Sequence, residues 1–171
     1  DLARRNAEDN GFQAAFRVIR GDLAKPPPLL APHAFDGVFF NPPYQRAGEG
    51  RPSPQETRAL ADCEGALGLA DWLRAALRLL KPKGCLTLIQ RADRLGELLA
   101  ALEGRVGNIA VLPLFPGGGA PAKRILLAAI KDSHAPLRLL PGLTLHDGEG
   151  RYSAAAEQLL RDGAALRLRA D

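Results

Sequence analysis

The tetrapeptide Asn41-Pro42-Pro43-Tyr44 is the part of the sequence whose residue types and spacing best suit chemistry. Proline has no backbone N–H and holds φ near −65°, so two prolines in succession end a strand and form a stiff corner. The Asn41 side-chain oxygen and the Pro42 carbonyl could then accept both hydrogens of one NH2 group. Two such acceptors would push the nitrogen from planar towards tetrahedral and turn its lone pair towards an electrophile.

Tyr44 adds an aromatic ring that can stack on the flat group bearing this nitrogen, an interaction worth about 1–3 kcal/mol for a nucleobase. Transfer of a methyl group to the nitrogen needs orientation, with the reacting atoms held about 3–3.5 Å apart, and no metal. Cys63 and Cys85 match no zinc spacing and the three histidines stand far apart, so we expect no metal site. The competing interpretation of the tetrapeptide is a plain proline-rich turn after a strand.

The elements around the tetrapeptide predict an α/β sheet. The apolar segment Phe35–Phe40 is expected to be a strand that leads directly into Asn41, and ligands of open α/β sheets bind at the carboxyl ends of strands. Alternating helices and strands favour a parallel sheet with crossover helices. Hydrophobic periodicity predicts helices over 1–10, 69–80, 94–103 and 152–161, strands over 16–20, 35–40, 85–90, 108–114 and 124–130, and an extended segment over 137–145.

Punctuating residues predict where these elements end. Gly11 is expected to cap the first helix, and Gly84 to stop the helix over 69–80, whose C-terminal dipole Lys81 and Lys83 would suit. The polar segment 45–65 reads as a long loop, and long loops in compact domains are usually functional or mobile.

Composition sets broad limits on the protein class. A chain of 171 residues with 46% apolar and 25% charged residues suits one globular domain. A net charge of +4 and an isoelectric point of about 9.4 permit a polyanionic partner, although a solvated arginine-rich surface explains them equally well. The chain has no membrane-length apolar run and does not open like a signal peptide, so we expect no membrane partner and a cytoplasmic location. The absence of methionine predicts that the printed chain is part of a longer product.

The segment Phe35–Tyr44, with Gly21-Asp22 before it and Leu79–Gly84 after it, resembles the Rossmann-like class I methyltransferases that modify amino groups. Within that group the chain most resembles the bacterial tRNA1(Val) adenine-37 N6-methyltransferases. The subfamily likeness comes from the opening helix, from Pro121-Ala122-Lys123-Arg124, and from a tail of the form Leu-Arg-Leu-Leu-Pro-Gly-Leu-Thr-Leu-His, Gly-Arg-Tyr-Ser and Leu-Leu-Arg-Asp-Gly.

This resemblance implies a Rossmann-like methyltransferase sheet with flanking helices, S-adenosyl-L-methionine as the cofactor and tRNA as the partner. Residues 1–171 would form the C-terminal portion of a single methyltransferase domain. Its first strands, its glycine-rich cofactor loop and the acidic residue for the ribose would precede residue 1, so we expect this chain alone to bind the cofactor weakly.

The resemblance also assigns roles to residues. The catalytic residues would be Asn41, Pro42, Pro43 and Tyr44; the cofactor-binding residues Asp22, Leu23 and Asn41; and the substrate-binding residues Tyr44, Gln45, Lys123 and Arg124. An ordinary turn after a strand is the other interpretation of Asp22. Gly117–Gly119, together with Lys123 and Arg124, could cradle RNA phosphates, or could simply be a loop that enters a basic strand.

The expected function is therefore a methyltransferase acting on adenine N6 of tRNA, with the flipped adenine stacked on Tyr44. A protein glutamine N5-methyltransferase and a ribosomal RNA guanine N2-methyltransferase are the enzymatic alternatives, because their substrates present the same flat NH2 group. A truncated domain that binds RNA without catalysis is the alternative from another class.

Overall fold

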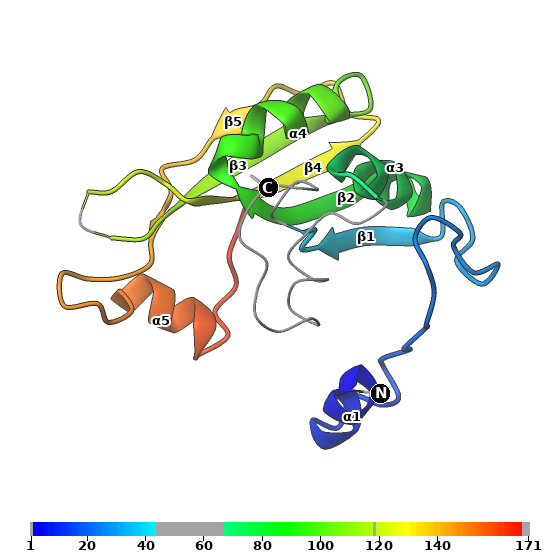
Figure 1. Ribbon diagram of the computed structural model, residues 1–171, viewed down its shortest axis with the longest axis horizontal. Coiled ribbons are helices and arrows are strands. Elements are labelled where there is room, and N and C mark those ends of the chain that lie inside the picture. The colour runs from blue at the N-terminus through cyan, green and yellow to red at the C-terminus, as the bar shows by residue number, and fades with distance from the viewer. Residues whose placement is uncertain (1, 44–66, 118, 169–171) are drawn as a thin grey trace. The chain divides into compact units, whose positions relative to one another are not determined.

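The computed structural model describes residues 2–43, 67–117 and 119–168 (Figure 1). Tyr44, Gln45 and Cys63 lie outside these ranges. The chain divides into two compact units, a first unit over Asp1–Leu30 and a second unit over Ala31–Asp171.

The first unit begins with helix α1, Leu2–Asp9. Gly11 ends it with φ at 73°, and the Phe12 backbone N–H bonds to the Ala7 carbonyl at 2.7 Å, which confirms the predicted glycine cap. The strand predicted over 16–20 is wrong, because these residues have no regular structure. A β-prone segment becomes a strand only when a neighbour satisfies its backbone groups. Among the described residues of this unit, the one β-pairing is an isolated bridge between Asp22 and Lys25.

The second unit is built on a mixed sheet in the order β1-β2-β4-β3-β5, with β6 also paired to β3. The strands are β1 Phe35–Phe40, β2 Leu80–Arg91, β3 Val106–Phe115, β4 Arg124–Lys131, β5 Arg138–Leu139 and β6 Leu143–Thr144. The α/β class is confirmed. The expectation of a fully parallel sheet is wrong for β4, which runs antiparallel to both of its neighbours. Residues 116–123 are too few for a crossover helix, so β3 and β4 form a hairpin.

Helices α3, Leu69–Leu79, and α4, Leu95–Leu102, lie on the same side of the sheet (Figure 1). Their apolar stripes and the facing strand residues form the core, in which each buried leucine contributes about 1.5–3 kcal/mol. The core includes Leu69, Leu73, Leu77, Leu86, Leu88, Leu98, Leu102 and Leu127. A short 3-10 turn, Ala92–Arg94, joins β2 to α4, and helix α5, Ala154–Leu160, follows the last strand.

The end of α3 differs from the expected one. The helix stops at Leu79 and β2 starts at the next residue, so Gly84 lies inside a strand and does not stop the helix. A cation that bonds the carbonyls at the helix C-terminus is Lys131, at the end of β4. Its Nζ donates to the Leu77 carbonyl at 2.8 Å and to the Leu80 carbonyl at 2.9 Å.

Lys81 and Lys83 therefore do not serve the helix end as predicted. Lys81 pairs with Asp36 of β1 at 2.8 Å, and this hydrogen bond and its charge lower the pKa of the Asp36 carboxyl. Lys83 donates to the carbonyl of Asp132. The reason is local, since Pro82 disfavours helical backbone at the residue before it and sends Lys81 into the strand.

Candidate amino-group site at the carboxyl edge of the sheet

The Asn41-Pro42-Pro43 corner follows directly after β1, as the sequence predicts. Phe40, the last strand residue, stacks on Trp72 of α3, with ring centroids 5.9 Å apart and planes inclined by 18°. Pro42 is fully buried, Pro43 is half-buried and Asn41 is exposed. Pro42 thus anchors the corner in the core, while Asn41 is exposed to solvent.

Gln90 fixes the last residue of the corner, Pro43, by a hydrogen bond. Its side chain is 0% exposed at the end of β2, and its Nε2 donates to the Pro43 carbonyl at 3.2 Å. Its Oε1 accepts the Arg91 backbone N–H at 2.8 Å. Sequence reasoning missed this residue. The available signal was the alternation of β2, which places Gln90 on the same inward face as Leu86 and Leu88.

The two acceptors predicted from the sequence are the Asn41 side-chain oxygen and the Pro42 carbonyl. Within the described ranges, the Asn41 side chain and the Pro42 carbonyl receive no hydrogen bond from another residue. An exposed amide oxygen beside a proline carbonyl can accept two hydrogens from one flat amino group. The roles of Tyr44 and Gln45 fall outside the described residues and stay predictions.

The sheet register brings the predicted cations to the same edge. β4 runs antiparallel to β2, so its first residue, Arg124, lies opposite Arg91, next to Gln90. Lys123 precedes it, and its backbone bonds to Ala92 and Leu114. The side chains of Lys123 and Arg124 are exposed. The edge that carries the Asn41 corner therefore also carries cations suited to an anionic partner.

Gly117 has a structural reason to be glycine. Its φ is 141°, and a Cβ there would lie 2.7 Å from the His146 carbonyl oxygen. The His146 ring in turn stacks on Tyr152, with centroids 5.1 Å apart. This close approach supports the interpretation of Gly117 as part of a loop, and the phosphate cradle stays a prediction.

The predicted cofactor residues Asp22 and Leu23 belong to the first unit. Asp22 Oδ1 accepts the Ala24 backbone N–H at 2.9 Å, the bond of an ordinary turn. Its second carboxylate oxygen has no partner among the described residues and is able to accept from a ligand. Asn41 lies in the second unit, so a shared cofactor site with Asp22 stays a prediction.

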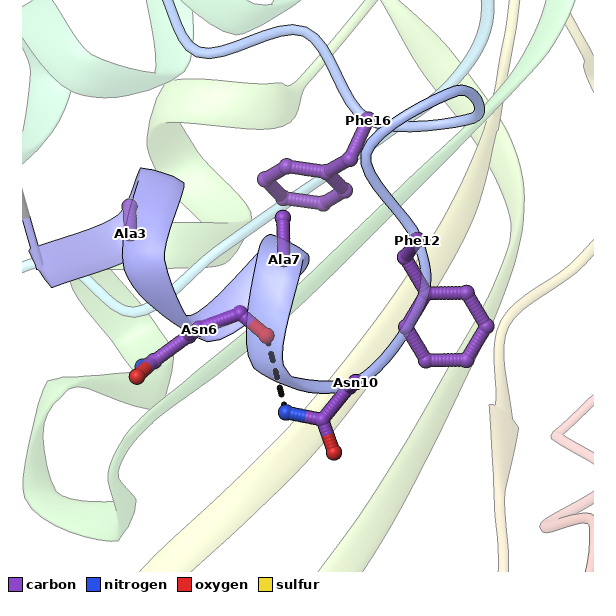
Figure 2. A pocket seen from close by; sticks show the side chains of 6 residues that line it. All are labelled: Ala3, Asn6, Ala7, Asn10, Phe12 and Phe16. Carbon is purple, nitrogen blue, oxygen red and sulfur yellow. Dashed lines mark hydrogen bonds between the residues drawn. The ribbon is translucent and has the colours of Figure 1, made fainter.

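The first unit also has a pocket of about 310 Å³ between α1 and the segment that follows it (Figure 2). Phe12 and Phe16 line it together with helix residues, and the Asn10 side chain donates to the Asn6 carbonyl at 2.8 Å. Asp22 and Leu23 do not line it. The pocket therefore gives no support to their cofactor role.

Two broader expectations concern metals and membranes. In the described part of the chain, no three His, Cys, Asp or Glu side chains are grouped as a metal site would require. None of the helices described there has the length and apolar character needed to cross a bilayer.

Comparisons with known proteins bear on this fold. The chain is 36% identical over 100 residues to the tRNA1(Val) (adenine(37)-N6)-methyltransferase of Tolumonas auensis, and 32% identical over 100 residues to the enzyme of the same name from Porphyromonas gingivalis. This chain is a distant homologue of methyltransferases. The matches cover 58% and 57% of it, but only 39% and 38% of the two relatives.

A solved structure extends the likeness over the fold. A predicted O-methyltransferase from Agrobacterium tumefaciens superposes with a TM-score of 0.75 at 27% identity, covering 96% of this chain and 73% of that one. No family model matches the chain. The sheet and its helices are therefore those of a methyltransferase fold.

Proposed function

We propose that the protein is an S-adenosylmethionine-dependent N-methyltransferase whose substrate is the N6 amino group of an adenine in tRNA. The observation that carries this proposal is the corner at the end of β1, where Asn41 is exposed, Pro42 is buried and Pro43 is held by Gln90. A rigid corner whose prolines carry carbonyl acceptors and no N–H donors, at the ligand-binding edge of an α/β sheet, suits a flat NH2 group.

The corner acts by orientation. The Asn41 side-chain oxygen and the Pro42 carbonyl accept the two N–H bonds of the substrate amino group, which draws the nitrogen lone pair out of conjugation. Because the prolines fix the backbone, this geometry is set before the substrate arrives, and little reorganisation is needed during the reaction. The proton released after transfer leaves to water.

The cofactor would supply the electrophilic methyl group. We assign the cofactor contact to Asp22, because one of its carboxylate oxygens is engaged in a turn and the other can accept from an adenine amino group or a hydroxyl. Leu23, which is half-buried, would add an apolar contact beside it.

Two observations support tRNA as the substrate class. The matched stretch resembles two tRNA adenine methyltransferases, and the exposed cations Lys123 and Arg124 lie at the same sheet edge as the corner. Phosphate contacts by Lys and Arg supply much of the affinity for nucleic acids.

The test uses the protein with a donor labelled in its methyl group. Undermethylated tRNA, ribosomal RNA and a peptide release factor are offered separately. Label in tRNA, recovered as N6-methyladenosine after digestion, is the expected result. Label found only in the release factor or only in guanine would overturn the adenine assignment. Binding of tRNA with no transfer to any substrate would overturn the enzymatic proposal.

A further inference from the structure

The side-chain amide of Gln90 has its orientation fixed by its two neighbours. Oε1 accepts the Arg91 backbone N–H at 2.8 Å, and Nε2 donates to the Pro43 carbonyl at 3.2 Å. If the amide were flipped, its NH2 would face a donor and its oxygen would face an acceptor. Both bonds would then be broken in a side chain that is 0% exposed, where an unsatisfied polar group is costly.

We propose that Gln90 is a positioning residue for methyl transfer, which acts by holding the Pro43 carbonyl; this inference rests on the proposed function. Because a peptide unit is planar, a fixed carbonyl also fixes the direction in which the chain leaves Pro43. One lone pair of the Pro43 carbonyl then has its donor, whereas the Asn41 side-chain oxygen and the Pro42 carbonyl have none among the described residues. Gln90 thereby sets the orientation of the corner that carries the acceptors for the amino group.

The chemistry of Gln90 suggests a variant that can be switched by pH. In Gln90→Glu, the neutral carboxyl group can still accept from Arg91 and donate its O–H to the Pro43 carbonyl. The ionised form has no donor and sets a negative charge against the carbonyl oxygen. Burial raises the pKa of a carboxyl at this place, so the bond is present at low pH and disappears as the pH rises through that raised pKa.

The first experiment reads the bond without reference to activity. Pro43-Tyr44 is the one Pro-Tyr pair in the chain, so labelling proline carbonyls with ¹³C and tyrosine nitrogens with ¹⁵N gives a single carbonyl NMR signal for this peptide. We expect Gln90→Leu to shift this signal at every pH. In Gln90→Glu the signal should match the parent at low pH and move as the pH rises.

The second experiment measures methyl transfer per folded molecule. Misplacement of a site by about 1 Å can cost on the order of 100-fold in rate, so we expect kcat of Gln90→Leu to fall by roughly 10- to 100-fold with little change in KM. In Gln90→Glu, kcat should approach the parent value at low pH and fall as the pH rises. The pH profile of the parent should show no such fall. The matched control is Thr87→Val, on the opposite face of the same strand, which should leave both kcat and the carbonyl signal unchanged.

The outcomes separate this inference from the proposed function. An unmoved carbonyl signal in Gln90→Leu overturns the positioning role, whatever the activity. A shifted signal with unchanged kcat also overturns it, because the bond would then be structural only. A parent protein that transfers no methyl group contradicts the proposed function and with it the catalytic role of Gln90, while the carbonyl signal still reports whether Gln90 holds Pro43.

Discussion

Arg91, at the end of β2, lies directly opposite Arg124, at the start of β4. Like charges placed opposite each other across two strands repel. Arg91 offsets part of this cost through its guanidinium, which binds Asp93, with Nε to Oδ1 at 3.0 Å.

Replacing the exposed cations should weaken tRNA binding. In Arg124→Gln and Lys123→Gln, we expect a lower affinity and a plot of log affinity against log salt that is less steep by about 0.7–0.9 for each phosphate that the variant no longer neutralises. Filter binding at several salt concentrations measures both quantities. Lys81→Gln, at the other end of β2, serves as the control of equal charge change. A salt slope that stays the same in both edge variants would remove Lys123 and Arg124 from the tRNA-binding surface.

Removing the Asn41 amide should greatly slow methyl transfer without unfolding the protein. Asn41 is exposed, so we expect Asn41→Ala to change the free energy of unfolding by no more than about 0.5 kcal/mol. Turnover should fall by roughly 100-fold or more, as it does when one preorganised hydrogen-bonding partner of a transition state is removed. Asn41→Asp keeps an acceptor oxygen and should retain more activity than the alanine variant. Near-normal turnover of Asn41→Ala, measured with labelled methyl donor, would exclude it from the mechanism.

Lys131 should contribute to stability because it caps α3. Its Nζ donates to the carbonyls of Leu77 and Leu80, and Lys131→Met removes these bonds while keeping most of the apolar stem. Hydrogen bonds to charged groups contribute about 1.5–3 kcal/mol, so we expect the free energy of unfolding to fall by that amount in urea denaturation. Arg74→Met, on the exposed face of α3, should change stability by less than about 0.5 kcal/mol. Equal decreases in the two variants would contradict the capping role.

Two glycines of the second unit should respond in opposite directions to alanine. A Cβ at Gly84 would lie 2.9 Å from the Lys81 carbonyl oxygen and 3.1 Å from that of Asp36. Overpacking of this kind costs typically about 1–3 kcal/mol. A Cβ at Gly96, on the exposed side of α4, meets nothing within 4 Å, so Gly96→Ala should stabilise the protein by about 0.5–1 kcal/mol. Thermal denaturation of both variants checks the sign of each change.

The parts of the fold that are local in sequence could be predicted. Gly11 ends α1 because a left-handed residue is needed there, and the glycine itself supplies it. The strand Phe35–Phe40 runs into two prolines that must end it, so the position of the Asn41 corner followed from neighbouring residues alone. Helices α3 and α4 were visible in their apolar periodicity.

The features that depend on distant partners could not be predicted. Gln90 bonds to Pro43 across 47 residues, and Lys131 bonds to Leu77 across 54. The segment 16–20 has strand-like alternation but forms no strand, because strand formation requires a partner and not only a pattern.

The sequence by itself determined the backbone of the corner, since two adjacent prolines restrict it and lack N–H donors whatever surrounds them, and the asparagine adds an amide oxygen that can accept. Only the tertiary structure decided what holds that corner and which charges lie at the same edge of the sheet. Hydrogen-bond partners and opposing strand residues are chosen by register and direction, and β4 acquired its direction from the short connection after β3.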